Sequence, residues 1–179
     1  MYDTEKFVGM AVEYGFTKAC ELNVASLVFR TEVRDMCAAD RCSSYGKNWC
    51  CPPACGTIED AAAMIKNYGY GIIVETVGQL EDEYDFDSMK SAGELHKQNF
   101  ARLIGELRKT YPDLLAMGAG TCTLCEKCSC PDSPCRHPDE RISSMEAWGL
   151  WVSDVCEKSG IPYNNGKCTV TYVSCWLLK

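Results

Sequence analysis

Apolar residues recur along the chain with two spacings, one typical of helices and one typical of strands. A spacing of three and four residues predicts a helix over residues 4–14, which Gly15 is placed to end. The apolar face of this helix consists of Phe7, Val8, Ala11 and Val12. Shorter, more continuous apolar runs predict strands at residues 23–30, 70–77, 114–120 and 168–178.

Three further segments have helical spacing. Thr57 is placed to cap a helix over residues 58–68, with acidic side chains in its first turn. Residues 86–111 predict a long helix that a proline closes. Residues 143–159 predict another helix.

Helices that alternate with about four strands indicate the α/β class, as a single layered domain with a small central sheet flanked by helices. The 179 residues of the chain are the length of one domain, which is expected to span residues 1–179. Two cysteine-rich loops, residues 37–55 and 122–135, interrupt this scaffold, and each follows a segment predicted to be a strand. Loops held by a rigid frame are where binding sites usually lie, so these loops carry the candidate site.

Cysteine occurs 14 times, which is more than packing requires in a chain of this size. The N-terminal segment lacks a basic stretch followed by an apolar run, and no segment approaches the roughly 20 apolar residues of a membrane span. A cytoplasmic location is expected, where thiols stay reduced and crowded cysteines indicate metal more often than disulfides. The net charge of −7, without a basic run, argues against nucleic acid and membrane as partners.

The cysteine spacing of the second loop indicates a metal site more clearly than that of the first loop. Its sequence CTLCEKCSCPDSPCRHP has the spacing C-x2-C-x2-C at Cys122, Cys125 and Cys128. A tight loop with this spacing can wrap an iron–sulfur cubane, whereas zinc normally takes its ligands as two separated pairs. Cys135 is the preferred fourth ligand, because the chain can turn through the prolines before it, and Cys130 is the less certain alternative. A 4Fe–4S cluster is therefore expected in this loop.

The first loop, CAADRCSSYGKNWCCPPACG, holds five cysteines at irregular spacing. Cys51 precedes a proline, which favours an extended backbone, and neighbouring side chains of an extended chain point to opposite faces. Cys50 and Cys51 are therefore not expected to bind one cluster together, and Cys50 is the less certain ligand. The ligands assigned to a first cluster are Cys37, Cys42, Cys51 and Cys55. Structural zinc on the same four residues is the alternative.

The two histidines are interpreted as solvated side chains. His137 lies beside Arg136, and His96 stands alone in a predicted helix. Neither is assigned to a metal site.

Four blocks of the sequence, in this order, resemble a known family. They are CSSYGKNWCCPPACGT, CTLCEKCSCPDSPCRHP, SSMEAWGLWV and IPYNNGKCTVTYVSCWLL. From about residue 33 to its end, the chain is similar to the predicted metal-binding, cysteine-rich proteins grouped as domain of unknown function 2284. The resemblance implies a small cytoplasmic iron–sulfur protein, found largely in anaerobes, and it supplies no substrate. The family's cysteines fall on Cys51, Cys122, Cys125, Cys128 and Cys135.

These observations predict a protein that binds two 4Fe–4S clusters and transfers electrons. The sequence contains no dinucleotide or phosphate loop and no nucleophile with an identifiable base. Two such clusters would make the chain more acidic and favour a redox partner protein with a basic docking surface. The alternatives are a reductase or metal-cofactor activating enzyme whose cluster has an open site, and a structural zinc module that recruits a partner.

Overall fold

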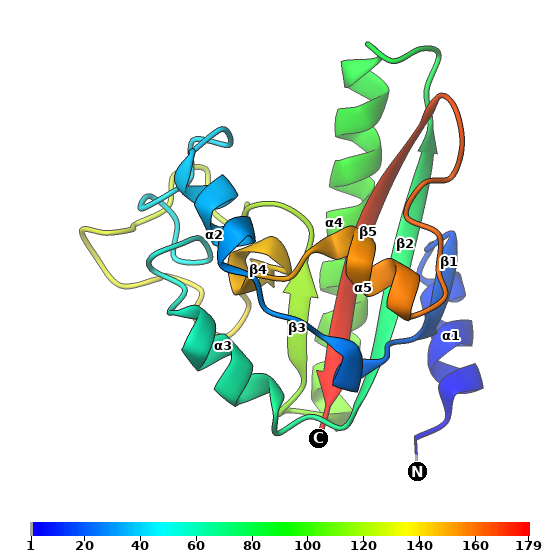
Figure 1. The fold of residues 1–179 in the computed structure, drawn as a ribbon, viewed down its shortest axis with the longest axis horizontal. Helices are drawn as coiled ribbons and strands as arrows, with labels where there is room; N and C mark the ends of the chain where they lie inside the picture. Colours follow the sequence, from blue (N-terminus) through cyan, green and yellow to red (C-terminus); the bar gives the residue numbers. More distant parts are fainter. Residues whose placement is uncertain (1) are drawn as a thin grey trace.

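Five strands form one open mixed sheet within residues 2–179, the part of the chain that the computed structural model describes (Figure 1). The order across the sheet is β1–β2–β5–β3–β4, and β3–β4 is its parallel pair. The strands are β1 (Lys18–Glu21), β2 (Tyr70–Gln79), β3 (Leu115–Gly118), β4 (Ser143–Ser144) and β5 (Thr169–Leu178). The α/β class is confirmed, with one strand more than the sequence predicts.

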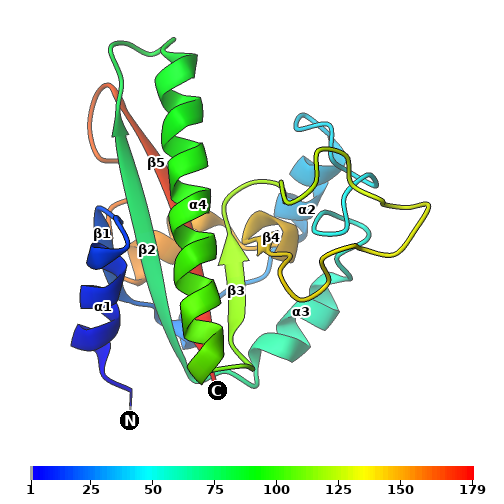
Figure 2. The same ribbon diagram turned by 180° about the vertical axis from the view of Figure 1, so that it is seen from behind.

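Helices cover both faces of the sheet. α1 and α4 lie across one face, as the reverse view shows (Figure 2), and α5 lies on the other (Figure 1). α2 and α3 lie beyond the β3–β4 edge. The helices are α1 (Thr4–Glu13), α2 (Thr31–Ala38), α3 (Ile58–Ile65), α4 (Phe86–Thr110) and α5 (Val152–Lys158). The helices predicted over residues 4–14, 58–68 and 86–111 are thus confirmed as α1, α3 and α4.

The two long central strands are buried on both faces, which explains their nearly continuous apolar sequence. Ile72 of β2 pairs with Trp176 of β5, and both side chains join the core under α1 and α4. The next pair along the ladder, Ile73 and Cys175, joins the core on the α5 side. Because side chains alternate along a strand, one apolar run supplies two cores.

The strand predicted at residues 23–30 is wrong. A 3-10 turn, Val24–Ser26, occupies this segment, and the strand that joins the sheet is β1, which precedes it. Leu27 and Phe29 pack against the core on the α5 side from a loop. Their apolar character therefore reflects burial of a connection rather than a place in the sheet.

The helix predicted over residues 143–159 is interrupted. Its first residues form strand β4 beside β3, a 3-10 turn at Glu146–Trp148 follows, and only the last part is helical, as α5. Gly149 separates the turn from the helix with a φ of +85°, a conformation that side-chain-bearing residues rarely adopt. The interruption turns Glu146 and Ala147 toward the first cysteine loop.

His96 is buried, so its interpretation as a solvated side chain is wrong. The residue lies on α4 and is 0 % exposed. Its ring nitrogens are 2.8 Å from the Thr76 hydroxyl on β2 and 2.7 Å from the Ser174 hydroxyl on β5. Burial lowers the pKa of His96 to about 3, so the ring is neutral at physiological pH.

α3 begins with a capping box directly after the first cysteine loop. The Thr57 hydroxyl accepts from the Asp60 N–H at 3.0 Å, and the Asp60 carboxylate accepts from the Thr57 N–H at 3.0 Å. Thr57→Ala is expected to lower the free energy of unfolding by about 1 kcal/mol, because the Asp60 N–H loses its acceptor and the Asp60 carboxylate loses the Thr57 hydroxyl. Denaturant unfolding measures the change. Thr57→Ser keeps the acceptor and serves as the control; equal stability of the alanine and serine variants would contradict the capping role.

Candidate metal centre

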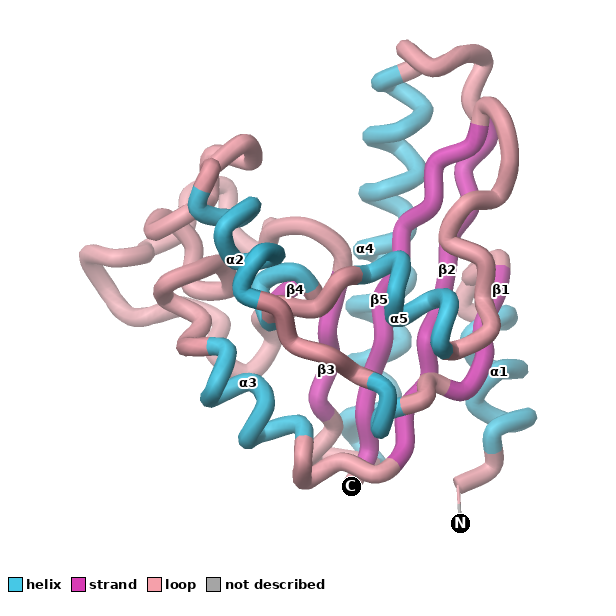
Figure 3. The backbone as a smooth tube through the Cα atoms, in the orientation of Figure 1, coloured by secondary structure: helices cyan, strands magenta, loops and turns pink. Residues whose placement is uncertain are grey.

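The two cysteine loops lie side by side beyond the β3–β4 edge of the sheet, where the backbone is mostly loop (Figure 3). Asn48 Nδ2 donates to the Cys122 carbonyl oxygen at 3.1 Å, and Trp49 Nε1 donates to the Ser133 carbonyl oxygen at 3.0 Å. Arg141 donates to the Trp49 carbonyl oxygen at 3.3 Å. These bonds join residues that are 74 to 92 positions apart in the sequence. The loops therefore form one composite region.

The first loop brings together the four cysteines that the sequence assigns to a first cluster. Cys37 lies in the last turn of α2, and Cys55 lies shortly before α3. Cys37, Cys42 and Cys51 line a hollow of about 320 Å³. Cys55 Sγ lies 3.5 Å from the carbonyl oxygen of Ala147, which lines the same hollow. We call these four cysteines the first thiol set.

Arg34 holds the first thiol set against the rest of the fold. Its guanidinium donates to Cys55 Sγ at 3.5 Å and to the Gly56 carbonyl oxygen at 2.6 Å. The same group donates to the carbonyl oxygen of Ala147. Burial raises the pKa of Cys55, and the positive charge of Arg34 opposes this shift. Arg34 is thus a cation placed to stabilise a thiolate at Cys55.

The thiols of the first set oppose one another's ionisation. Burial raises the pKa of Cys51 to about 12, and the negative charges of Cys42, Cys55 and Cys37 add to the shift. Burial also raises the pKa of Cys37. Such a set ionises fully when a metal displaces its protons, because the metal's positive charge offsets both burial and repulsion.

Five cysteines, rather than four, lie together at the second loop. Cys122, Cys125, Cys128 and Cys135, the residues assigned to a second cluster, line a hollow of about 20 Å³. Cys50 of the first loop lines the same hollow and is only 2 % exposed. We call these five cysteines the second thiol set.

Within the second thiol set, Cys50 and Cys122 affect each other's ionisation. The interaction with Cys122, together with burial, raises the pKa of Cys50, and the interaction with Cys50 lowers the pKa of Cys122. The backbone groups of Leu124 and Ile142 lower the pKa of Cys122 further. The extended backbone favoured before Pro52 directs the Cys50 side chain away from that of Cys51, but the sequence does not indicate what Cys50 faces. No local sequence signal supplies that partner, because it comes from the contact between the two loops.

Cys135 and Cys130 take different positions in the second loop. Cys135 lines the hollow, and its sulfur accepts from the His137 backbone N–H at 3.4 Å. Cys130 is buried but does not line the hollow, and its Sγ lies 3.8 Å from the Gly46 carbonyl oxygen. Cys130 therefore contributes to the contact between the loops.

The donor chemistry of both thiol sets fits an iron–sulfur cluster or zinc. All 14 cysteines, which fall within residues 2–179, are free. Thiolates are soft ligands that select zinc, copper(I) and iron–sulfur clusters over magnesium or calcium. Within the same residues, no three His, Cys, Asp or Glu side chains converge on a point suited to a single metal ion. Both thiol sets border hollows, and the backbone N–H group of His137 points at the Cys135 sulfur in the second.

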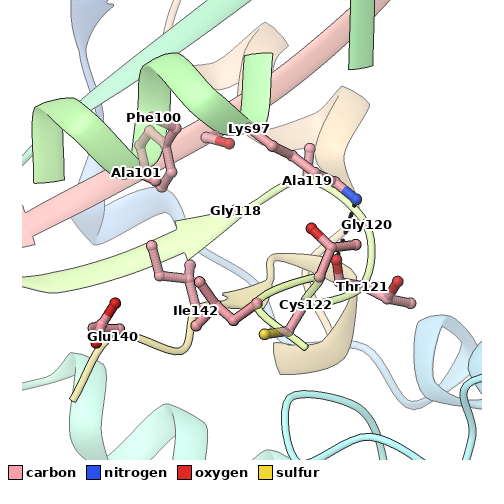
Figure 4. Close-up of a pocket in the computed structure, with 13 residues that line it drawn as sticks. Lys97, Phe100, Ala101, Gly118, Ala119, Gly120, Thr121, Cys122, Glu140 and Ile142 are labelled. Carbon is pink, nitrogen blue, oxygen red and sulfur yellow. Dashed lines mark hydrogen bonds between the residues drawn. The ribbon is translucent and has the colours of Figure 1, made fainter. Parts of the chain in front are cut away.

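A third hollow, of about 80 Å³, adjoins Cys122 on the side of α4 (Figure 4). Lys97 of α4 reaches over it and donates to the Thr121 carbonyl oxygen at 3.1 Å. Phe100 supplies an apolar wall, and Glu140 a carboxylate. The hollow offers space for a small molecule beside a candidate ligand.

The comparisons with known proteins agree with this donor chemistry. A family model described as "Predicted metal-binding protein (DUF2284)" matches residues 20–178. Searches of the curated proteins and of the solved structures find no match. Among the described residues, no helix has the length and apolar character needed to cross a membrane. Since the family model covers nearly the whole chain, including both thiol sets, the chain belongs to the DUF2284 family of predicted metal-binding proteins.

Proposed function

We propose that the chain binds two 4Fe–4S clusters, one on each thiol set, and transfers electrons. The observation that carries the proposal is the arrangement of nine thiols in two adjoining sets of four and five, of which three and five line a hollow. Four thiolates are the usual complement of one 4Fe–4S cluster. The clusters would supply one-electron redox chemistry.

Several groups of the chain are placed to tune such clusters. Arg34 presents a positive charge to Cys55, and the backbone N–H group of His137 points at the sulfur of Cys135. Hydrogen bonds to ligating sulfur, burial and nearby charge are the protein's means of setting a cluster's reduction potential. These groups would stabilise the more negative, reduced state of each centre.

The redox partner is proposed to be a cytoplasmic protein with a basic docking surface. The chain carries a formal net charge of −7 before any thiolate is counted. Clusters held by four thiolates add negative charge to it. Opposite charge on the partner would steer the encounter, and the association rate is then expected to fall as ionic strength rises.

Elemental analysis of anaerobically purified protein tests the proposal. About eight irons and about eight acid-labile sulfides per chain are expected for two 4Fe–4S clusters. A brown protein whose visible absorption bleaches on reduction with dithionite is expected with them. A colourless protein that holds about two zinc ions and no sulfide would replace the redox function with the structural zinc module.

The hollow beside Cys122 favours a second candidate function, an enzyme whose cluster has one iron free to bind a small molecule. Lys97 and Glu140 could orient such a molecule next to this sulfur. Cyanide is a suitable probe, because it binds open iron and not iron with four thiolate or sulfide neighbours. A change in the paramagnetic resonance signal of the reduced protein on addition of cyanide would favour the enzyme, and an unchanged signal would favour electron transfer.

A further inference from the structure

The hollow of about 80 Å³ beside Cys122, which we call the inner hollow, continues into a larger one along α4. This outer hollow measures about 470 Å³. Lys97, Gly120 and Thr123 line both, so the two hollows adjoin. The outer hollow is also lined by Gln98, an exposed residue of α4. A small molecule can therefore enter from solvent, pass Lys97 and come to lie beside the second thiol set.

The side chain of Lys97 stands where the two hollows meet, with its ammonium group over the backbone that leads into Cys122 (Figure 4). Its Nζ donates to the Thr121 carbonyl oxygen at 3.1 Å. An ammonium group has three N–H donors, so two remain available to a ligand. Within residues 2–179, no carboxylate oxygen lies within 4 Å of Lys97 Nζ. Lys97 therefore offers an unneutralised positive charge to an anion.

The two carboxylates that line these hollows have other neighbours. Glu140 Oε1 lies 3.5 Å from His137 Nδ1, and the Glu140 side chain is 70 % exposed. Glu94 Oε1 lies 3.9 Å from Lys90 Nζ, one turn away on α4. Neither carboxylate thus neutralises Lys97 by direct contact.

Apolar side chains form most of the inner hollow. Phe100 and Ala101 of α4 line one side, and Leu124 and Ile142 line it from the chain around the second loop (Figure 4). Pockets for drug-sized ligands measure about 300–1,000 Å³, so a hollow of about 80 Å³ suits a far smaller molecule. The inner hollow combines this apolar space with one cation at its entrance.

We infer that the inner hollow binds a short-chain monocarboxylate, whose carboxylate accepts from Lys97 Nζ and whose apolar tail packs between Phe100 and Ile142. The inference deepens the second candidate function, since it names the class of small molecule, and it rests on that candidate for the ligand's role beside iron. Binding itself requires only the hollow and Lys97.

Ligand-detected proton resonance of the anaerobically purified full chain tests the inference, with butyrate as the probe at constant ionic strength. Saturable binding is expected, with a Kd on the order of 1 mM for so small a ligand. Acetate is expected to bind about tenfold more weakly, because it buries two methylene groups fewer. Butylamine, which carries a positive charge on a similar tail, is not expected to bind. Absence of saturable butyrate binding, or equal binding of butylamine, would overturn the inference.

Three variants locate the site. Lys97→Gln is expected to weaken butyrate binding about tenfold or more, because the carboxylate loses a charge-assisted hydrogen bond. Ala101→Leu keeps every charge and fills the inner hollow from an exposed helical position, and a loss of about tenfold is again expected. Lys90→Gln is the matched control, because it removes a positive charge from α4 but lines only the outer hollow. The Kd of this variant is expected to stay within about twofold of the wild-type value.

Equal losses in Lys97→Gln and Lys90→Gln would contradict the site, because butyrate would then respond to the charge of α4 as a whole. Unchanged affinity in Ala101→Leu would remove the tail from the inner hollow and overturn the assignment. The cyanide experiment separates the inference from the second candidate function. Butyrate binding without a response to cyanide would exclude the open iron and keep the carboxylate site. A response to cyanide without butyrate binding would keep the enzyme and overturn the inference.

Discussion

Replacing Cys51 by serine is expected to reduce the iron content of the purified protein from about eight to about four per chain. Cys51 is buried among the thiols of the first set, and its neighbours in space are Cys42, Cys55 and Cys37. A serine hydroxyl is a harder ligand than a thiolate and stays protonated at neutral pH, so it suits an iron–sulfur cluster poorly. The first cluster would lose one of its four ligands, while the second set stays complete.

Iron and sulfide analysis, with the paramagnetic resonance signal that remains, measures this loss. Cys168→Ser is the control, because Cys168 is exposed in the turn before β5 and lines neither hollow. About eight irons are expected to remain in that variant. A Cys51→Ser protein that keeps its full iron content would remove Cys51 from the first ligand set. A Cys168→Ser protein that loses half of its iron would show that iron content reports folding rather than ligation.

Acidification from pH 8 to pH 5 is expected to cost the wild-type protein about 2 kcal/mol of unfolding free energy through His96 alone. The ring is buried on α4, and its pKa of about 3 lies well below the ordinary value of 6.5 that applies in the unfolded chain. Below pH 6.5 the unfolded state therefore binds a proton that the folded state does not. Stability is fully present above pH 6.5 and is lost progressively as the pH falls toward 3.

Comparison with His96→Gln isolates this contribution. Glutamine can still hydrogen-bond the hydroxyls of Thr76 and Ser174, but it does not titrate. Glu75 acts in the opposite direction, because burial raises its pKa, and it acts equally in both proteins. Denaturant unfolding at pH 8 and pH 5 is expected to show a loss about 2 kcal/mol larger in the wild type than in the variant. Parallel pH profiles would mean that His96 titrates as it does in the unfolded chain.

The periodic segments of the fold could be predicted from the sequence, because their patterns follow from burial on one or both faces. α4 shows helical spacing, and β2 and β5 are continuously apolar because helices cover both faces of the sheet. The segment at residues 23–30 has the same apolar character for a different reason, since it packs as a loop against one core. Propensity alone does not distinguish these two cases.

The first thiol set could also be proposed from the sequence. The structure brings the four cysteines of that proposal together, which are Cys37, Cys42, Cys51 and Cys55. Local geometry suffices there, because all four lie within one loop and the turn of α2 that leads into it. The place of Cys50 could not be predicted. Cys122, which lines the same hollow, is 72 residues further along the chain, and no local rule specifies which loops meet.

The sequence by itself determined the α/β class, the concentration of cysteines in two loops and the division of Cys50 from Cys51, because these depend on periodicity, composition and the conformation that a proline imposes on its neighbour. The tertiary structure alone decided that the two loops adjoin, that Cys50 faces the second set and that His96 is buried. These depend on which surfaces of the sheet and loops pack together. Such packing is set by contacts between residues distant in the sequence, and it produces no periodic pattern of apolar residues in the segments that meet.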